Sequence, residues 1–174
     1  MSNTQLFFSI FDLSHKSILL DNSMIFGAQY VIFLAFLLVI LLGLKGKGRE
    51  KKAIFLITLG IIYAEILIWL IHLVYQEPRP FVAFPINTLV KHGADAAFPS
   101  GHTTIMAVIA SAYYFYKSKF APIFFILMLW VGFSRIFIGV HYPFDILGGM
   151  FVGLVAVRLA WETKNWFKGK ISKL

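Results

Sequence analysis

Long apolar blocks with few charges alternate along the chain with short segments that hold most of the charged residues. Five blocks are predicted to be helices, and they comprise residues 24–44, 53–75, 101–116, 121–139 and 144–161. A helix needs about 20 mainly apolar residues to cross the hydrocarbon core of a bilayer, and these blocks come close to that length. The pattern therefore predicts an all-α membrane protein, a polytopic helical bundle with about five spans.

Residues 1–22 do not read as a spanning segment, because their apolar residues are interrupted by four polar side chains: Asp12, His15, Lys16 and Asp21. The segment also lacks the basic start of a secretory signal. We predict an N-terminal interfacial or re-entrant helix there. Residues 1–174 are expected to form one integral-membrane domain, with its core at 53–161 and a cytoplasmic basic tail at 162–174.

The composition supports a membrane location, because 59% of the residues are hydrophobic, against about half in a soluble domain. The net charge of +8 comes from basic residues that lie between the apolar blocks. Such residues are typical topology signals, so no nucleic-acid partner is expected. Alternating the spans puts eleven of them on one side: Lys45, Lys47, Arg49, Lys51, Lys52, Lys117, Lys119, Lys164, Lys168, Lys170 and Lys173. We predict a multi-pass cell-membrane protein with its N-terminus outside and its C-terminus in the cytoplasm.

The loop at 76–98 is predicted to lie outside, and its prolines prevent a continuous helix. The preceding span contains one acid, Glu65, in a stripe of side chains at helical spacing that points toward Arg79. An ionisable residue within a span normally faces protein or water. Glu65 therefore either tunes His72 or a neighbouring arginine, or is a protonated acid that bonds two helices together.

Candidate chemistry begins at Ser134-Arg135, which is followed after five residues by His141 and after three more by Asp145. An arginine offers a fixed fork of donors to phosphate oxygens, and a histidine can attack phosphorus or carry a proton. A nearby aspartate can hold the imidazole in one tautomer and stabilise its positive form. This pattern is weak on its own.

Two further motifs complete a candidate phosphate site. Pro99-Ser100-Gly101-His102 opens a predicted helix, whose first backbone N–H groups attract phosphate, and the glycine lets an oxygen approach closely. Arg79 and Arg135 can each bind oxygens bidentately. The predicted topology puts all of these motifs at one membrane face with His141. A surface histidine, an ordinary helix cap and a snorkelling arginine could explain each motif separately, but their coincidence at one face disfavours that explanation.

These motifs, with Arg79-Pro80 as the first, resemble the three signature motifs of the type 2 phosphatidic acid phosphatase superfamily. The resemblance implies that His141 is the nucleophile and forms a phosphohistidine, that Asp145 is its partner, and that His102 is the proton donor. It also implies that the phosphoryl group is bound, without metal or cofactor, by Arg79, Arg135, Ser100 and Gly101. The sequence agrees, since it contains no cysteine and no cluster of acids or histidines at metal-ligand spacing.

One position departs from that family. The first motif of the family begins with a lysine seven residues before the arginine, where this chain has His72. A protonated His72 would keep the positive charge for phosphate binding, or Lys91 from the loop would supply part of it. Histidine titrates near neutrality, so its charge depends on pH in the range where a lysine stays charged.

Glu77 is a further accessory candidate, because it lies two residues before Arg79. We interpret it as an acid that holds the arginine in place. It could instead act on the proton of a second phosphate, or be an exposed loop acid.

The short loops and the sequence Glu77-Pro78-Arg79-Pro80-Phe81-Val82 are similar to bacterial undecaprenyl-diphosphatases of the bacitracin-resistance type. That resemblance implies hydrolysis of the terminal phosphate of undecaprenyl diphosphate, the lipid carrier of cell-wall synthesis, at the outer face of the membrane. Phosphatidylglycerophosphate and phosphatidic acid are the alternative substrates. A lipid-binding or transport protein is a non-enzymatic alternative, which the intact catalytic set disfavours. The membrane spans disfavour a vanadium haloperoxidase.

Overall fold

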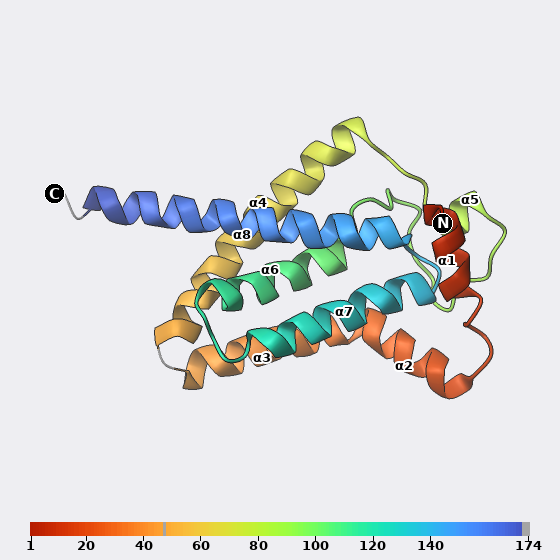
Figure 1. Ribbon diagram of the computed structural model, residues 1–174, viewed down its shortest axis with the longest axis horizontal. Coiled ribbons are helices and arrows are strands. Elements are labelled where there is room, and N and C mark those ends of the chain that lie inside the picture. The colour runs from red at the N-terminus through yellow and green to blue at the C-terminus, as the bar shows by residue number, and fades with distance from the viewer. Residues whose placement is uncertain (47, 172–174) are drawn as a thin grey trace.

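The structure, a computed structural model, describes residues 1–46 and 48–171 and contains no strand in that part of the chain (Figure 1). The all-α prediction is therefore confirmed for these residues. The helices in the described residues are α1 (Asn3–Phe11), α2 (Ile18–Gln29), α3 (Val31–Lys45), α4 (Gly48–Val74), α5 (Pro80–Ala83), α6 (Gly101–Phe115), α7 (Ala121–Phe137) and α8 (Pro143–Ile171).

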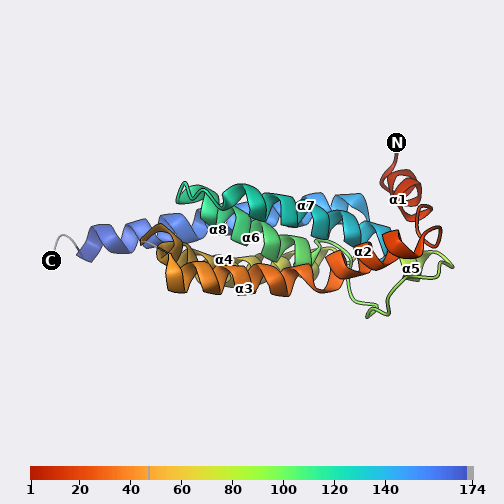
Figure 2. The same cartoon turned by 90° about the horizontal axis from the view of Figure 1, so that it is seen from below.

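Helix α6 lies at the centre of an elongated bundle. Figure 2 shows it between α7 and α8 on one side and α3 and α4 on the other. Its main packing partners are α8, α7 and α4, and ten of its 15 residues are buried. A helix without a polar face belongs in the interior of a bundle. The motif that precedes and opens α6 is thereby carried to the middle of one end of the molecule.

Two glycines of α8 let it approach α6 closely. A Cβ atom at Gly153 would lie 2.6 Å from the Cβ of Ala107. A Cβ at Gly149 would lie 2.7 Å from the carbonyl oxygen of Ser100. Glycines four residues apart share one helix face and permit close contact between membrane helices. Since the backbone N–H of Ser100 also donates to the carbonyl oxygen of Asp145 at 3.0 Å, the start of α6 is fixed against the start of α8.

Within the part of the chain that the structure describes, two helices, α4 and α8, are long and apolar enough to cross a membrane. The predicted first span at 24–44 is not one straight helix, because α2 and α3 meet with a bend of 51° and together form a third candidate. Tyr30 separates them, and its backbone (φ −109°, ψ −27°) departs from regular helical geometry. Helix α7 is apolar but shorter. The count of about five spans stays a prediction.

Helix α8 continues well past the predicted span at 144–161, as far as Ile171. The first part of the predicted basic tail is therefore a helical extension. Arg158 and Glu162, one turn apart, form an ion pair there at 2.6 Å, and Nζ of Lys164 lies 3.5 Å from the ring centre of Trp161. Residues 172–174 of the predicted tail lie outside the described residues.

Helix α1 crosses the end of the bundle where α7 and α8 are joined (Figure 1). Its buried residue Phe7 meets the ring of Tyr142 edge-on, with ring centres 5.5 Å apart. The side-chain oxygen of Asn3 accepts from the backbone N–H of Phe144 at 3.0 Å. The N-terminal helix is thus a packed part of the fold, and it braces the turn between α7 and α8. Its predicted position at the membrane interface stays a prediction.

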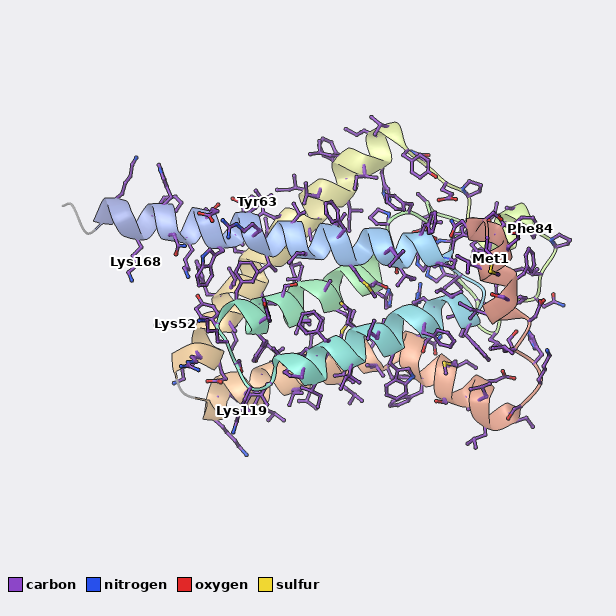
Figure 3. The ribbon with its side chains drawn as sticks, in the orientation of Figure 1. Met1, Lys52, Tyr63, Phe84, Lys119 and Lys168 are labelled. Carbon is purple, nitrogen blue, oxygen red and sulfur yellow. The ribbon has the colours of Figure 1, made fainter. Side chains whose placement is uncertain are left out.

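The candidate chemistry and the basic segments lie at opposite ends of the molecule. Figure 3 places Lys52, Lys119 and Lys168 toward one end, whereas Met1 and Phe84 lie at the other. Phe84 directly follows α5 in the 76–98 loop, which covers the same end as α1. This loop is tied to the turn after α7 by a hydrogen bond from Leu89 N–H to the carbonyl oxygen of Ile138 at 3.2 Å.

Candidate active site

A cavity of about 260 Å³ lies at the loop-covered end of the bundle. It is bounded by α4, the 76–98 loop, the start of α6, the end of α7 and the turn before α8. Its lining residues are Glu65, Ile68, His72, Arg79, His92, Asp95, Ala96, Pro99, Gly101, His102, Arg135 and His141. The structure therefore brings together side chains from all three predicted motifs, which are far apart along the chain.

His141 and Asp145 are positioned by the turn between α7 and α8. Gly139 makes the turn with φ +89°, a conformation that side chains with a Cβ rarely adopt. Pro143 then begins α8, and Asp145 falls in its first turn, where a negative charge is favourable. The carboxylate Oδ2 of Asp145 accepts from the backbone N–H of Tyr142 at 2.7 Å and lies 3.2 Å from Nδ1 of His141. Both side chains are buried.

The contacts of His141 fix its tautomer. Nη1 of Arg79 lies 3.0 Å from Nε2 of His141, and a guanidinium can only donate. Nε2 therefore accepts, and the ring proton lies on Nδ1, where it is donated to Asp145. Burial, together with the positive charges of Arg135 and Arg79, holds the pKa of His141 well below its usual value. The ring is neutral, and its unprotonated nitrogen faces the arginine fork, as a nucleophile requires.

Arg79 is almost fully buried and nearly saturated with acceptors. Its Nε donates to the carbonyl oxygen of Asp95 at 3.1 Å, and its Nη2 donates to the carboxylate of the same residue at 3.0 Å. Nη1 donates to the carbonyl oxygen of Val140 at 3.0 Å, in addition to His141. The arginine is held in one orientation, with its Nη1 end at Nε2 of His141.

Arg135, near the end of α7, is also buried but less completely bonded. Its Nη2 lies 2.7 Å from Nε2 of His92, whereas its Nε is buried and has no partner among the described residues. A buried donor without an acceptor is unfavourable by about 1–3 kcal/mol. An anion in the cavity would satisfy that donor.

The Ser100-Gly101-His102 motif presents the N-terminus of α6 to the cavity. Ser100 is the N-cap residue, as predicted, but its hydroxyl makes no capping bond and instead accepts from the hydroxyl of Thr103 at 3.1 Å. A Cβ at Gly101 would meet nothing within 4 Å, so packing does not require the glycine. The space beside it leaves the first N–H groups of α6 open to a ligand. The ring of His102 lines the cavity and makes no hydrogen bond to the described residues.

Comparison with known proteins identifies the arrangement. The family model of the PAP2 superfamily matches residues 52–168. The chain belongs to the PAP2 superfamily. This is a family of phosphatases, hydrolases that act on phosphate esters or diphosphates.

Individual relatives match over most of the chain. The chain is 39% identical to undecaprenyl-diphosphatase BcrC of Bacillus subtilis (strain 168) over 153 residues, which cover 88% of this chain and 79% of that protein. It is 27% identical to the bacitracin transport permease protein BcrC of Bacillus licheniformis over 162 residues, covering 92% and 80%. Among solved structures, LpxE of Aquifex aeolicus superposes with a TM-score of 0.71 at 26% identity, covering 92% of this chain and 94% of that one.

Of the accessory candidates in this PAP2 chain, His72 and Glu65 line the cavity, whereas Glu77 and Lys91 do not. Nε2 of His72 lies 3.0 Å from the carbonyl oxygen of Phe98, so His72 lines the cavity with one nitrogen bonded to the backbone. Because a carbonyl only accepts, that nitrogen carries a proton. Glu65 lines the same cavity from a position two turns earlier in α4.

Two accessory candidates are placed differently in the PAP2 site from what the sequence suggested. Glu77 does not hold Arg79. The buried guanidinium donates instead to Asp95, to the carbonyl oxygen of Val140 and to His141. Lys91 does not line the cavity, and its part in replacing the family lysine stays a prediction. Its side chain is exposed, whereas the next residue along the chain, His92, lines the cavity.

His92 and Asp95 are the site residues that the sequence analysis missed. Both belong to the irregular loop at 76–98, where no helical or strand periodicity relates one side chain to another. The available signal was the sequence Lys91-His92-Gly93-Ala94-Asp95, a concentration of polar residues just before the Pro99-Ser100-Gly101-His102 motif.

Proposed function

We propose that this protein is a metal-independent membrane phosphatase that removes the terminal phosphate of undecaprenyl diphosphate through a phosphohistidine on His141. The observation that carries this proposal is the pair of hydrogen bonds made by His141. Its Nδ1 lies at the carboxylate of Asp145, and its Nε2 accepts from Arg79 at the lining of a cavity with two buried arginines. Such a group is ready to attack an anion of phosphorus. The similarity to the undecaprenyl-diphosphatase of Bacillus subtilis supports the choice of substrate.

In the proposed first step, Nε2 of His141 attacks the terminal phosphorus, and the bond between that phosphorus and the bridging oxygen breaks. His102 donates a proton to the bridging oxygen, which leaves as undecaprenyl phosphate. The phosphorylated imidazole is a cation, which the carboxylate of Asp145 stabilises. In the second step, His102 takes a proton from water as the water attacks phosphorus. Inorganic phosphate leaves, and His141 is regenerated.

The phosphoryl oxygens are assigned to three groups of donors. Arg79 presents its Nη1 beside Nε2 of His141, where the terminal phosphate must approach, and Arg135 offers its unpartnered Nε. Ser100 and Gly101 contribute the donors at the start of α6. Their positive potential supplies the charge stabilisation that many other phosphatases obtain from metal ions.

We further propose that α2 with α3, α4, α6, α7 and α8 make the five spans, and that the cavity faces the outside. The support is the separation of charge along the molecule. The basic segments between α3 and α4, between α6 and α7, and at the end of α8 lie at the end opposite the cavity (Figure 3). Cytoplasmic segments are enriched in Lys and Arg. Reporter domains fused to either terminus should therefore report an external N-terminus and a cytoplasmic C-terminus.

The deciding experiment measures inorganic phosphate released from undecaprenyl diphosphate by detergent-purified protein in excess chelator. Release by the wild type, and none by His141→Ala of equal thermal stability, is expected. With the terminal phosphate radiolabelled, quenched wild-type protein should retain label and His141→Ala should not. Full activity in His141→Ala, or activity only when divalent metal is restored, would refute the mechanism.

Two alternatives are tested in the same assay. Faster hydrolysis of phosphatidylglycerophosphate or phosphatidic acid than of the diphosphate would replace the proposed substrate while keeping the chemistry. Binding of these lipids without any phosphate release would favour a lipid-binding or transport protein. The name of the relative from Bacillus licheniformis, a bacitracin transport permease protein, makes that control necessary.

A further inference from the structure

Two loop residues, His92 and Asp95, lie between the two arginines of the cavity. Nε2 of His92 is 2.7 Å from Nη2 of Arg135, and Oδ2 of Asp95 is 3.0 Å from Nη2 of Arg79. Within the pair, Nδ1 of His92 is 3.8 Å from Oδ1 of Asp95. We call His92 and Asp95 the loop bridge, because they connect the two guanidinium groups along one wall of the cavity.

The protonation states of the loop bridge follow from its partners. Since Arg135 can only donate, Nε2 of His92 accepts, and the ring proton lies on Nδ1, 3.1 Å from the carbonyl oxygen of Gly93. Burial and the positive charges of Arg79 and Arg135 lower the pKa of His92, although Gly93 and Asp95 act in the opposite direction. Burial alone would raise the pKa of Asp95, but Arg79 outweighs it, and the pKa lies below its usual value. His92 is therefore a neutral acceptor, and Asp95 is a carboxylate.

Asp95 binds one edge of the Arg79 guanidinium. Its backbone carbonyl oxygen accepts from Nε, and its carboxylate accepts from Nη2, so both hydrogen bonds lie on the same edge. Nη1 is left to point at Nε2 of His141. The side chain of Arg79 is 5% exposed, whereas that of Asp95 is 66% exposed. Asp95 therefore contributes little buried surface to the fold, and its contact with Arg79 is a separable feature of the site.

We propose that the loop bridge positions the arginines for phosphate: Asp95 fixes Arg79 with its Nη1 end at the reactive nitrogen, and His92 fixes Arg135 beside it. The proposal rests on the proposed function, since it takes the cavity to be the site of the scissile phosphate. His92 and Asp95 act through the arginines and are positioning residues. Pre-orientation of binding groups is the main way such residues act on rate, and misplacement by about 1 Å can reduce it about 100-fold.

The competing interpretation makes Asp95 a substitute for the substrate, a carboxylate that phosphate must displace from Arg79. The two interpretations predict opposite changes in phosphate affinity. Loss of a positioning carboxylate weakens the binding of phosphate, because Arg79 becomes free to turn. Loss of a competing carboxylate strengthens that binding, because one negative charge is removed from the site.

The test uses full-length, detergent-purified protein and inorganic phosphate as the probe, titrated by calorimetry, together with kcat and KM on undecaprenyl diphosphate. Asp95→Ala should weaken phosphate binding about tenfold or more and lower kcat/KM at least as much. Asp95→Asn keeps an oxygen acceptor for Nη2 and should stay within about threefold of the wild type. His92→Gln places an acceptor near the position of Nε2 and should retain most activity, whereas the shorter His92→Asn should not.

Ala94→Ser is the matched control, since Ala94 is an exposed residue of the same loop that does not line the cavity. It should leave phosphate binding and kcat/KM unchanged. Tighter phosphate binding by Asp95→Ala, or equal effects of the two His92 variants, would overturn the proposal. If Asp95→Ala fails to fold, the comparison of His92→Gln with His92→Asn decides. The calorimetric measurement needs no turnover, so it tests the loop bridge separately from the proposed function. If the variants show the predicted binding pattern but the protein does not hydrolyse the diphosphate, the proposed function is refuted and the positioning role of the loop bridge is retained.

Discussion

Replacing Asp145 by asparagine removes one negative charge beside His141 and leaves the shape of the side chain nearly unchanged. Oδ2 of Asp145 accepts from both the Tyr142 N–H and Nδ1 of His141, and Oδ1 has no partner among the described residues. An asparagine that directs its carbonyl oxygen to the Oδ2 position keeps both hydrogen bonds. Its NH₂ group then takes the place of the unpartnered oxygen. Asp145→Asn therefore tests the charge of Asp145 more than the tautomer of His141.

The size of the effect follows from the separation of the two groups. The carboxylate oxygen lies 3.2 Å from Nδ1 of His141. At an effective dielectric of about 20, opposite unit charges at that separation attract by about 5 kcal/mol. Because the asparagine carbonyl still bonds to the ring, we expect a loss of roughly 3–5 kcal/mol of transition-state stabilisation. That corresponds to a decrease in kcat of about 10²- to 10⁴-fold.

The assay is single-turnover release of phosphate from undecaprenyl diphosphate with enzyme in excess, so that product dissociation does not limit the rate. Asp12→Asn is the matched control, because Asp12 is an exposed acid at the end of α1, away from the cavity lining, and should keep the wild-type rate. Wild-type and Asp145→Asn proteins should melt at similar temperatures. A decrease of less than about tenfold in a folded Asp145→Asn protein would refute the assignment of a cationic phosphohistidine stabilised by Asp145.

Three further outcomes are expected. Because the pKa of His141 is lowered, protonation should block the nucleophile only well below pH 6.5. The acid limb of the kcat/KM profile should therefore lie below that pH. An acid limb centred above pH 6.5 would contradict the neutral state of His141. His72→Lys, which keeps its charge above neutrality, should extend activity to higher pH, and an unchanged pH profile would remove His72 from the phosphate site. Gly153→Ala should destabilise the protein by about 1–3 kcal/mol, because the new Cβ would meet Ala107 and the carbonyl oxygen of Thr104. Gly48→Ala is the control and should not destabilise it, because a Cβ at Gly48 meets nothing within 4 Å. Thermal melting in detergent measures the stability of both variants.

The parts of the site that belong to helices and their ends were predictable from sequence. His141 and Asp145 lie one helical turn apart across the start of α8, and this fixed spacing in sequence becomes a fixed spacing in space. Ser100-Gly101-His102 begins α6, as its composition predicts. The bend at Tyr30 was not predictable, because residues 24–44 carry no charge and contain no proline to mark a break.

The loop partners of the arginines could not be predicted in the same way. An irregular segment has no period, so the contact between Arg79 and Asp95, 16 residues apart, depends on the path of the loop across the end of the bundle. The sequence analysis favoured Glu77, which is nearer along the chain, as the acid partner of Arg79, and offered Lys91 beside His72 as a source of positive charge. In the structure, Asp95 is the acid partner of Arg79, and His92 accepts from Arg135, because the buried guanidinium groups require acceptors that point inward.

In the proposed mechanism, the charge balance of the cavity explains how one site can both bind the substrate and prepare the nucleophile. Arg79 and Arg135 are buried together, and the carboxylate of Asp95, mostly exposed, is their nearest acidic partner among the described residues outside the His141–Asp145 pair. Buried cations without balancing charge are unfavourable, so the site favours an anion. Burial and the same positive potential lower the pKa of His141 and so favour its neutral form. When a terminal phosphate binds, its negative charge offsets the arginines, and the ring can then carry the positive charge of the phosphohistidine. A phosphodiester headgroup brings a single charge, and we therefore expect it to bind more weakly and to prepare His141 less well than a terminal phosphate.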